Sequence, residues 1–135
     1  MRLLLDTHIV LAIVNETPEL LPASYRRLVD DKTAEFWCSV ASLWEIAIKF
    51  RINKLELVVP LDNLDGTCRS YNLDILSIEP HHVLAELSPL PATRDPFDRL
   101  LLAQASVEGM RLVTLDRALI GHPLVWAPPH EQPAP

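Results

Sequence analysis

Short apolar runs that alternate with helical segments are the feature that most constrains the fold of this chain. Residues 2–6 form an apolar run that ends in an aspartate, and residues 110–116 repeat that pattern near the other end of the chain. Two further β-prone runs lie between them, at residues 34–40 and 73–78, and residues 124–127 predict a last edge strand. Strands that alternate with helices favour a parallel sheet, joined by right-handed crossovers and covered by helices on both faces.

The segments between these runs carry apolar residues at helical spacing. The predicted helices span residues 9–14, 24–31, 42–55, 61–72 and 80–87, and a sixth begins at Pro96 with Asp95 as its cap. The chain has 135 residues, of which 49% are hydrophobic, and this is enough to bury one core. We therefore predict a single α/β domain over residues 1–127. The proline-rich tail, residues 128–135, is expected to be flexible.

Several features favour a cytoplasmic protein. The apolar N-terminus is interrupted by Asp6 and His8 and is followed by no small-residue cleavage pattern, so we do not expect export. No uninterrupted apolar stretch approaches the roughly 20 residues that span a bilayer. Cys38 and Cys68 form no CxxC or Cys/His cluster and are expected to be reduced thiols.

The net charge of −6 argues against a basic nucleic-acid-binding surface, but it leaves room for an enzyme whose negative charge is concentrated in a metal site. Four carboxylates fit such a site. Asp6 and Asp116 lie at the carboxyl ends of two predicted strands, and Glu45 and Asp98 lie in the first turns of two predicted helices. In parallel α/β sheets these positions meet at one edge, where ligands bind.

Each of these acids also has a purely structural interpretation. Ser42-x-x-Glu45 matches a capping box, Asp98 favours the helix dipole, and Asp6 and Asp116 suit turns. Taken together, however, four like charges in one pocket are tolerable only with cations or shared protons. Oxygen ligands of this kind suit Mg²⁺ or Mn²⁺, the ions that organise phosphate chemistry.

Neighbouring residues divide into structural and supporting roles. Asp95 precedes Pro96 and is interpreted as a helix cap rather than as a fifth ligand. Thr7 and Thr114 lie beside the strand-end acids, where they can hydrogen-bond a carboxylate or a metal-bound water, although threonine is also common in strands.

Four motifs give the chain a resemblance to a known family. They are "LLLDTH", "SVASLWEIAIK", "RDPFDRLLLAQA" and "LVTLD", they contain the four acids in order, and they cover residues 2–126. In these stretches the chain resembles the PIN-domain ribonucleases, in particular toxins of the VapC type. Relatives often carry His-Arg before D-P-F-D, where this chain has Thr93 and Arg94.

The resemblance implies a Mg²⁺- or Mn²⁺-dependent endoribonuclease with a central parallel sheet. It implies that Asp6, Glu45, Asp98 and Asp116 are both the metal ligands and the catalytic residues. It also implies an RNA substrate and a cognate VapB-type antitoxin that holds the toxin inactive. Members of the family are often homodimers.

Basic residues near the acids are candidates for contacts with RNA phosphates, although exposed basic residues are more often solvated or paired. They are Lys49, Arg51, Arg94, Arg99 and Arg117. The histidines of the chain form no metal-ligand spacing, and no Ser-His-Asp or Cys-His arrangement is present.

Two other classes of protein remain open at this point. A phosphatase or phosphotransfer domain would also collect acids at strand ends, but it favours a D-x-D arrangement, and Asp6 is followed by Thr7 and His8. A binding module without catalysis would not need four costly like charges.

A homodimer is also predicted from the helix at residues 42–55, which is apolar on more than one face. Burial in the core explains most of its apolar residues. Those at the spacing of the second face are Trp44, Ile48 and Ile52.

Overall fold

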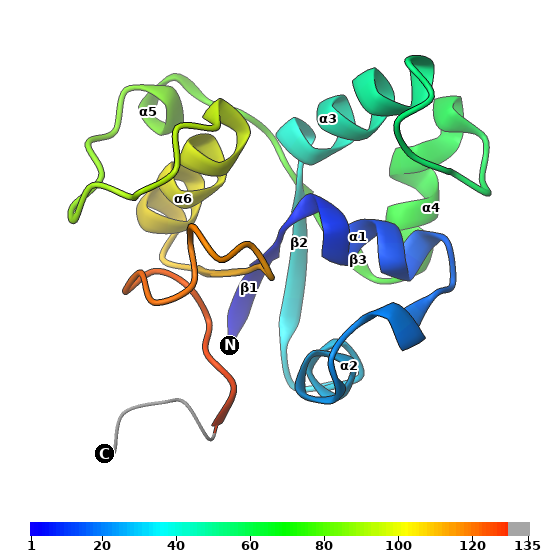
Figure 1. The fold of residues 1–135 in the computed structure, drawn as a ribbon, viewed down its shortest axis with the longest axis horizontal. Helices are drawn as coiled ribbons and strands as arrows, with labels where there is room; N and C mark the ends of the chain where they lie inside the picture. Colours follow the sequence, from blue (N-terminus) through cyan, green and yellow to red (C-terminus); the bar gives the residue numbers. More distant parts are fainter. Residues whose placement is uncertain (130–135) are drawn as a thin grey trace.

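A parallel four-stranded sheet forms the centre of the molecule in a computed structural model that describes residues 1–129 (Figure 1). The strands lie in the order β3-β2-β1-β4. Their bounds are Arg2–Leu5 for β1, Glu35–Ser39 for β2, Leu73–Leu76 for β3 and Arg111–Val113 for β4. In this register Leu3 lies opposite Phe36 on one side and Arg111 on the other. The predicted parallel α/β fold is therefore confirmed.

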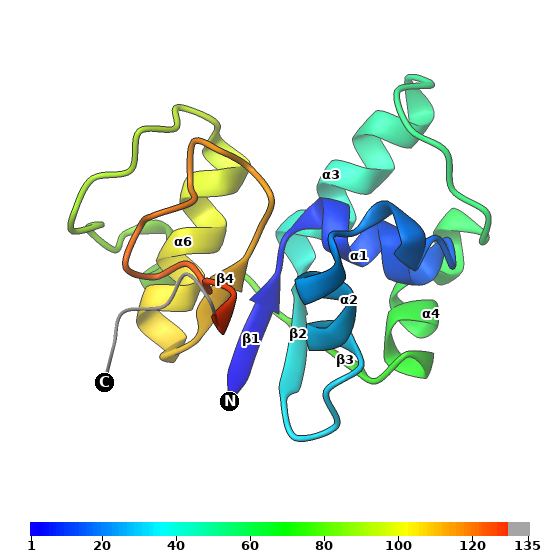
Figure 2. The ribbon, with the colours of Figure 1, turned by 60° about the horizontal axis from the view of Figure 1, so that its bottom comes forward.

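Six α-helices and two 3₁₀ turns connect the described strands. They are α1 (Thr7–Val14), η1 (Pro18–Leu20), α2 (Ala23–Val29), α3 (Val40–Arg51), η2 (Leu61–Asn63), α4 (Leu64–Ser70), α5 (Pro80–Val83) and α6 (Pro96–Glu108). Helices α1, α2 and α4 lie on one side of the sheet and α5 and α6 on the other (Figures 1 and 2). Helix α3 leaves the carboxyl end of β2 and contacts both α1 and α6.

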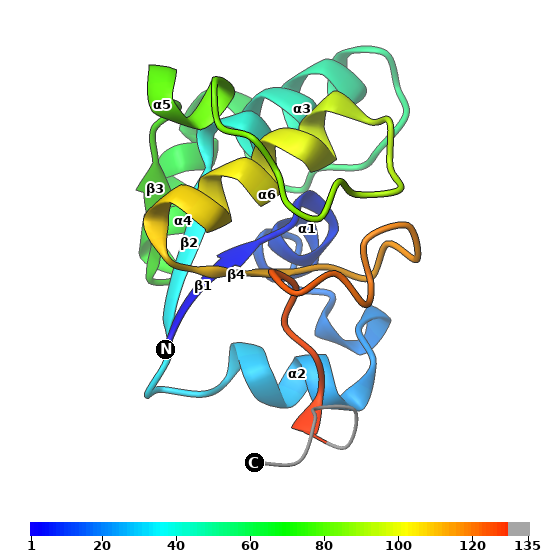
Figure 3. The same cartoon turned by 90° about the vertical axis from the view of Figure 1, so that its left-hand side faces the viewer.

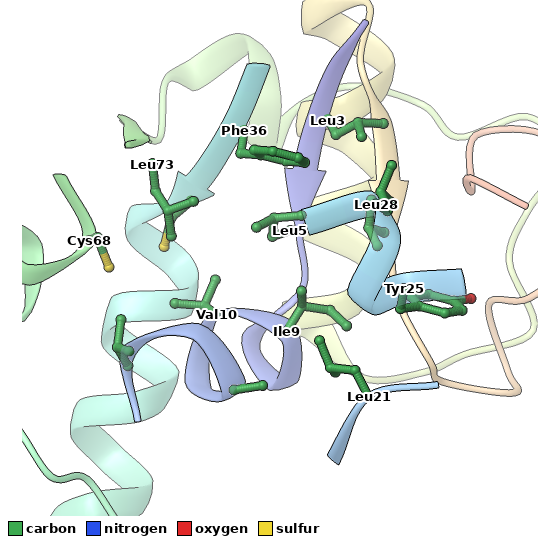
Figure 4. Close-up of a cluster of buried hydrophobic side chains, with 14 of the residues drawn as sticks. Leu3, Leu5, Ile9, Val10, Leu21, Tyr25, Leu28, Phe36, Cys68 and Leu73 are labelled. Atoms are coloured by element: carbon green, nitrogen blue, oxygen red, sulfur yellow. The ribbon is translucent and has the colours of Figure 1, made fainter. Parts of the chain in front are cut away.

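The core has two parts because the side chains of β1 alternate between the two faces of the sheet. Leu3 and Leu5 belong to the cluster formed with α1, α2 and α4, where Ile9 and Phe36 also lie (Figure 4). Leu4 belongs to the second cluster, which contains the inner face of α6. A strand buried on both faces reads as a continuous apolar run, which is why residues 2–5 carry no polar alternation after Arg2.

Helix α3 begins earlier than its sequence indicates. Ser39 is the N-cap, and its Oγ accepts a hydrogen bond from the backbone N–H of Ala41 at 3.0 Å. The helix therefore starts at Val40, and Glu45 lies in its second turn. The predicted capping box of Ser42 and Glu45 is wrong.

Several other elements are shorter than predicted. Helix α5 ends at Val83 instead of residue 87, and β4 ends at Val113, so that Asp116 lies in the loop that follows the strand. The expected edge strand is reduced to one bridge between Val125 and Leu112. Pro128, the first residue of the expected flexible tail, is buried, and residues 130–135 lie outside the described part of the chain.

Among residues 1–129, none of the helices has both the length and the apolar character needed to cross a membrane.

Candidate metal centre

The four predicted carboxylates come from four elements that meet at one edge of the sheet. Asp6 follows β1 and caps α1, Asp116 follows β4, Glu45 lies in α3, and Asp98 lies in the first turn of α6. Strands β2, β1 and β4 are parallel neighbours, so their carboxyl ends share this edge. The first turns of α6 lie beside α3 at the same end of the molecule (Figure 3), where the rings of Trp44 and Phe97 are in contact.

Asp6 is buried and both of its carboxylate oxygens accept hydrogen bonds. Thr114 Oγ1 donates to Oδ2 at 2.6 Å, and the backbone N–H of Thr7 donates to Oδ1 at 2.7 Å. Burial raises the pKa of Asp6 above its usual range; the two hydrogen bonds oppose this shift, and the charge of Glu45 adds to it. The carboxylate is thus fixed in position, but its charge lacks full compensation.

Thr7 connects Asp6 to Glu45. Its hydroxyl donates to Glu45 Oε1 at 2.6 Å and lies 3.1 Å from Ser42 Oγ. The second oxygen of Glu45, Oε2, accepts a hydrogen bond from Lys49 Nζ at 2.6 Å. One threonine therefore orients two of the predicted carboxylates.

Asp98 and Asp116 form the other half of the cluster. Thr93 Oγ1 donates to Asp98 Oδ2 at 3.0 Å. The pKa of Asp98 is raised to about 7, first by burial, which the bond from Thr93 opposes, and then by the charge of Asp95, a side-chain hydrogen bond with Asp116 and the charge of Asp6. The neighbouring acids thus add to the effect of burial and disfavour ionisation of Asp98.

This donor set fits a hard divalent cation. It offers only oxygen ligands, and burial raises the pKa values of Asp6 and Asp98, a shift to which neighbouring acids add. A bound cation would stabilise these buried charges.

Sequence reasoning assigned no role in the site to Thr93, which bonds Asp98, or to Ser42, which contacts the hydroxyl of Thr7. Thr93 Oγ1 bonds Asp98 and also accepts a hydrogen bond from the backbone N–H of Asp95 at 3.1 Å. The available signal was the position of Thr93 just ahead of the cap of α6. Asp95 is confirmed as that cap, because its Oδ1 accepts a hydrogen bond from the N–H of Phe97 at 2.8 Å.

The five predicted RNA contacts differ in their surroundings. Lys49 is paired with Glu45, and Arg99 Nε donates to the backbone carbonyl of Thr93 at 2.8 Å, so both touch the residues of the site. The other three are exposed and form no ion pair within residues 1–129. They are Arg51, Arg94 and Arg117.

A histidine cluster that the sequence did not predict lies between α5 and α6. Ligand atoms of His81, His82 and Glu108 come within 4.8 Å of one another. However, Nδ1 of the buried His82 accepts a hydrogen bond from the N–H of Glu79 at 2.9 Å, which places the ring proton on Nε2, 2.8 Å from Glu108 Oε2. Metal binding through Nε2 would move that proton to Nδ1, against the N–H of Glu79. We interpret the cluster as a polar connection between the two helices.

Fold and site together define a class: a parallel α/β domain with a carboxylate cluster beyond the carboxyl ends of its strands. The PIN domain family profile matches residues 3–121, and the chain belongs to that family.

The solved structures that share this fold include two complexes. One is VapBC2 from Rickettsia felis bound to a DNA fragment from its promoter, with 18% identity and a TM-score of 0.60. The other is a toxin–antitoxin complex from Klebsiella pneumoniae, with 15% identity and a TM-score of 0.60. Each match covers 93% of this chain and 96% of the other. No curated protein matches the chain significantly.

Proposed function

We propose that the chain is a Mg²⁺- or Mn²⁺-dependent endoribonuclease and the toxin of a VapBC-type toxin–antitoxin pair. Its metal ligands and catalytic residues are Asp6, Glu45, Asp98 and Asp116. The observation that carries the proposal is the contact network of these acids. Thr7 bonds both Asp6 and Glu45, and Thr93 bonds Asp98, whose pKa is raised mainly by burial and further by the neighbouring Asp116 and Asp6.

A divalent ion in such a site lowers the pKa of a bound water and offsets charge on a phosphodiester. The residues of the chain hold the ligands ready for it. Thr114 and Thr7 fix the Asp6 carboxylate, Thr7 orients Glu45, and Thr93 orients Asp98. Asp98 would hold the ion as a carboxylate, because a metal ligand must be deprotonated.

The proposed partner is a protein antitoxin. Two structures that share the fold are toxin–antitoxin complexes, which supports this part of the proposal. A basic segment of the antitoxin would compete with the metal for the crowded carboxylates, and arginine suits that role because its guanidinium binds carboxylates through two hydrogen bonds.

Cleavage of cellular RNA tests the activity. We expect cleavage with Mn²⁺ and none in EDTA, with fragment ends that sequencing assigns to defined positions. Asp98→Asn should lose cleavage, whereas Asp74→Asn, at an exposed acid of the edge strand β3, should keep it. Undiminished cleavage in EDTA would contradict the metal mechanism, and release of phosphate from a phosphomonoester instead would favour a phosphatase.

Growth tests the partner. Expression of the chain alone should arrest growth, and co-expression with the neighbouring reading frame should relieve the arrest and yield a stable complex. A chain that is harmless and leaves cellular RNA intact would contradict the assignment as a toxin.

A further inference from the structure

Lys49 is the cation that accompanies the carboxylate cluster. Its Nζ donates to Glu45 Oε2 at 2.6 Å, one helical turn along α3. The hydrogen bond with Glu45 raises the pKa of Lys49, burial opposes this, and the charges of Glu45, Asp95 and Asp6 raise it further. The Glu45 carboxylate that it binds is also linked to Asp6 through Thr7.

A second ion pair in the chain shows how this differs from an ordinary helix-surface pair. Arg69 and Asp65 have the same spacing of four residues, but their distance is 3.1 Å and their side chains are 59% and 50% exposed. The side chains of Lys49 and Glu45 are 39% and 11% exposed. Solvent screens the exposed pair, while the buried carboxylate of Glu45 depends more on its partner.

Both oxygens of Glu45 are engaged in this arrangement. Oε1 accepts from Thr7 Oγ1, and Oε2 accepts from Lys49. An ammonium and a divalent ion on the same carboxylate oxygen would repel each other at a few Å, where Coulomb forces are strong even with partial screening. The two cations would therefore compete for Oε2.

We propose that Lys49 is an internal counter-cation that competes with the divalent ion for Glu45 and leaves Oε2 when the ion binds. This inference rests on the proposed metal site. In the metal-free protein, Lys49 compensates the charge of Glu45 and thereby keeps the cluster assembled. The same contact weakens binding of the ion, and breaking it exposes an ammonium beside the site.

Calorimetry with Mn²⁺ tests the competition. Lys49→Met keeps the length of the side chain but removes its charge, and we expect the Mn²⁺ dissociation constant to fall by about tenfold. Lys49→Arg keeps the charge and should bind Mn²⁺ no more tightly than the unmodified chain. Arg69→Met breaks the exposed pair and should leave the affinity unchanged. Unchanged or weaker binding by Lys49→Met would overturn the proposal, as would equally tight binding by Lys49→Arg.

Acylation of lysines measures the release directly. The chain contains two other lysines, Lys32 and Lys54, both exposed, which serve as internal controls. Mass spectrometry should show that saturating Mg²⁺ increases the acylation rate of Lys49 several-fold relative to the other two. An unchanged ratio would show that Lys49 remains on Glu45 and would overturn the proposal.

Different results would reject the metal site and the role of Lys49. If the unmodified chain binds no Mn²⁺, the proposed metal site is wrong, and the competition is wrong with it. If the chain binds Mn²⁺ and Asp98→Asn loses that binding, while Lys49→Met binds like the unmodified chain, the metal site stands and only the role of Lys49 is rejected.

Discussion

Asp98 fits the local preference for an acid in the first turn of a helix, and its side chain also belongs to the acidic cluster. It is the third residue of α6, where a negative charge favours the helix dipole. Its carboxyl group, however, accepts a hydrogen bond from Thr93, and Asp116 and Asp6 contribute to its raised pKa, while Asp95 caps the helix. The preference for a negative charge at a helix start explains why an aspartate occurs at this position. The contacts of the Asp98 side chain, however, are made within the acidic cluster.

Replacing Asp98 separates these two interpretations. Above pH 7, where Asp98 is ionised, we expect metal-free Asp98→Asn to be as stable as the unmodified chain or more so, because one of several crowded negative charges is removed. Mn²⁺ affinity and RNA cleavage should fall steeply, since an amide oxygen is a poorer ligand for a hard cation. Urea unfolding in EDTA and calorimetry measure the two effects. A variant that is less stable by roughly 0.3–1 kcal/mol yet fully active would restrict Asp98 to the helix dipole.

The raised pKa of Asp98 also predicts a dependence of stability on pH. An unfolded aspartate loses its proton near pH 4, whereas folded Asp98 retains it to about 7. Between these values the folded state binds more protons, so the free energy of unfolding of the metal-free protein should decrease as pH rises. The raised pKa of Asp6 acts in the same direction.

Urea unfolding in EDTA at pH 5 and at pH 8 measures this change. Asp98→Asn should show a smaller decrease over the same interval, and subtracting its values removes the contributions of other groups. Equal decreases in both proteins would contradict the assigned pKa.

At the scale of elements, the start of α6 was predictable from neighbouring residues and the start of α3 was not. Asp95 and Pro96 are a local signal, and both take the predicted positions. The beginning of α3 could be capped by Ser39 or Ser42, and local rules favour the latter. Ser39 is the N-cap because of a tertiary contact: its hydroxyl also donates to Gln104 Oε1, 65 residues away, at 2.5 Å.

The site likewise contains some features that the sequence predicts and others that depend on tertiary contacts. The meeting of Asp6, Glu45 and Asp98 at one edge follows from parallel strands and the helices after them, so the pattern of the sequence was sufficient. The contact of the buried His82 with the partly buried Glu108, 26 residues apart, depends on how α6 packs against α5. No periodicity in the sequence encodes that contact.

The cap of α6 offers a matched test of structural against metal-binding acids. Asp95→Ala removes the acceptor for the N–H of Phe97, and we expect a loss of about 1 kcal/mol in the free energy of unfolding. Asp95→Asn keeps an equally good cap and should unfold like the unmodified chain. Mn²⁺ affinity should change little in Asp95→Asn, in contrast to Asp98→Asn. A steep loss of affinity in Asp95→Asn would make Asp95 a ligand.

At the scale of the whole molecule, α3 has apolar side chains that the core does not bury. Ile46 is buried against the sheet, while three side chains on another face are exposed by 61%, 36% and 55%. These are Trp44, Ile48 and Ile52, which recur every four residues and so form a stripe along the helix. Trp44 packs edge-on against Phe97, with ring centroids 5.7 Å apart, which extends the stripe toward α6.

We predict that this stripe is the contact surface of a homodimer, because a contiguous exposed apolar surface favours association. Light scattering at micromolar concentration should give twice the mass of the chain, and the melting temperature should rise with protein concentration. Ile48→Glu should yield a monomer, because it places a charge in the middle of the stripe. Ile120→Glu is the control, since Ile120 is also exposed, by 49%, but lies in the loop after β4. Circular dichroism of both variants establishes that they remain folded. A monomer mass for the unmodified chain, or dissociation by the control variant alone, would show that α3 does not form the interface.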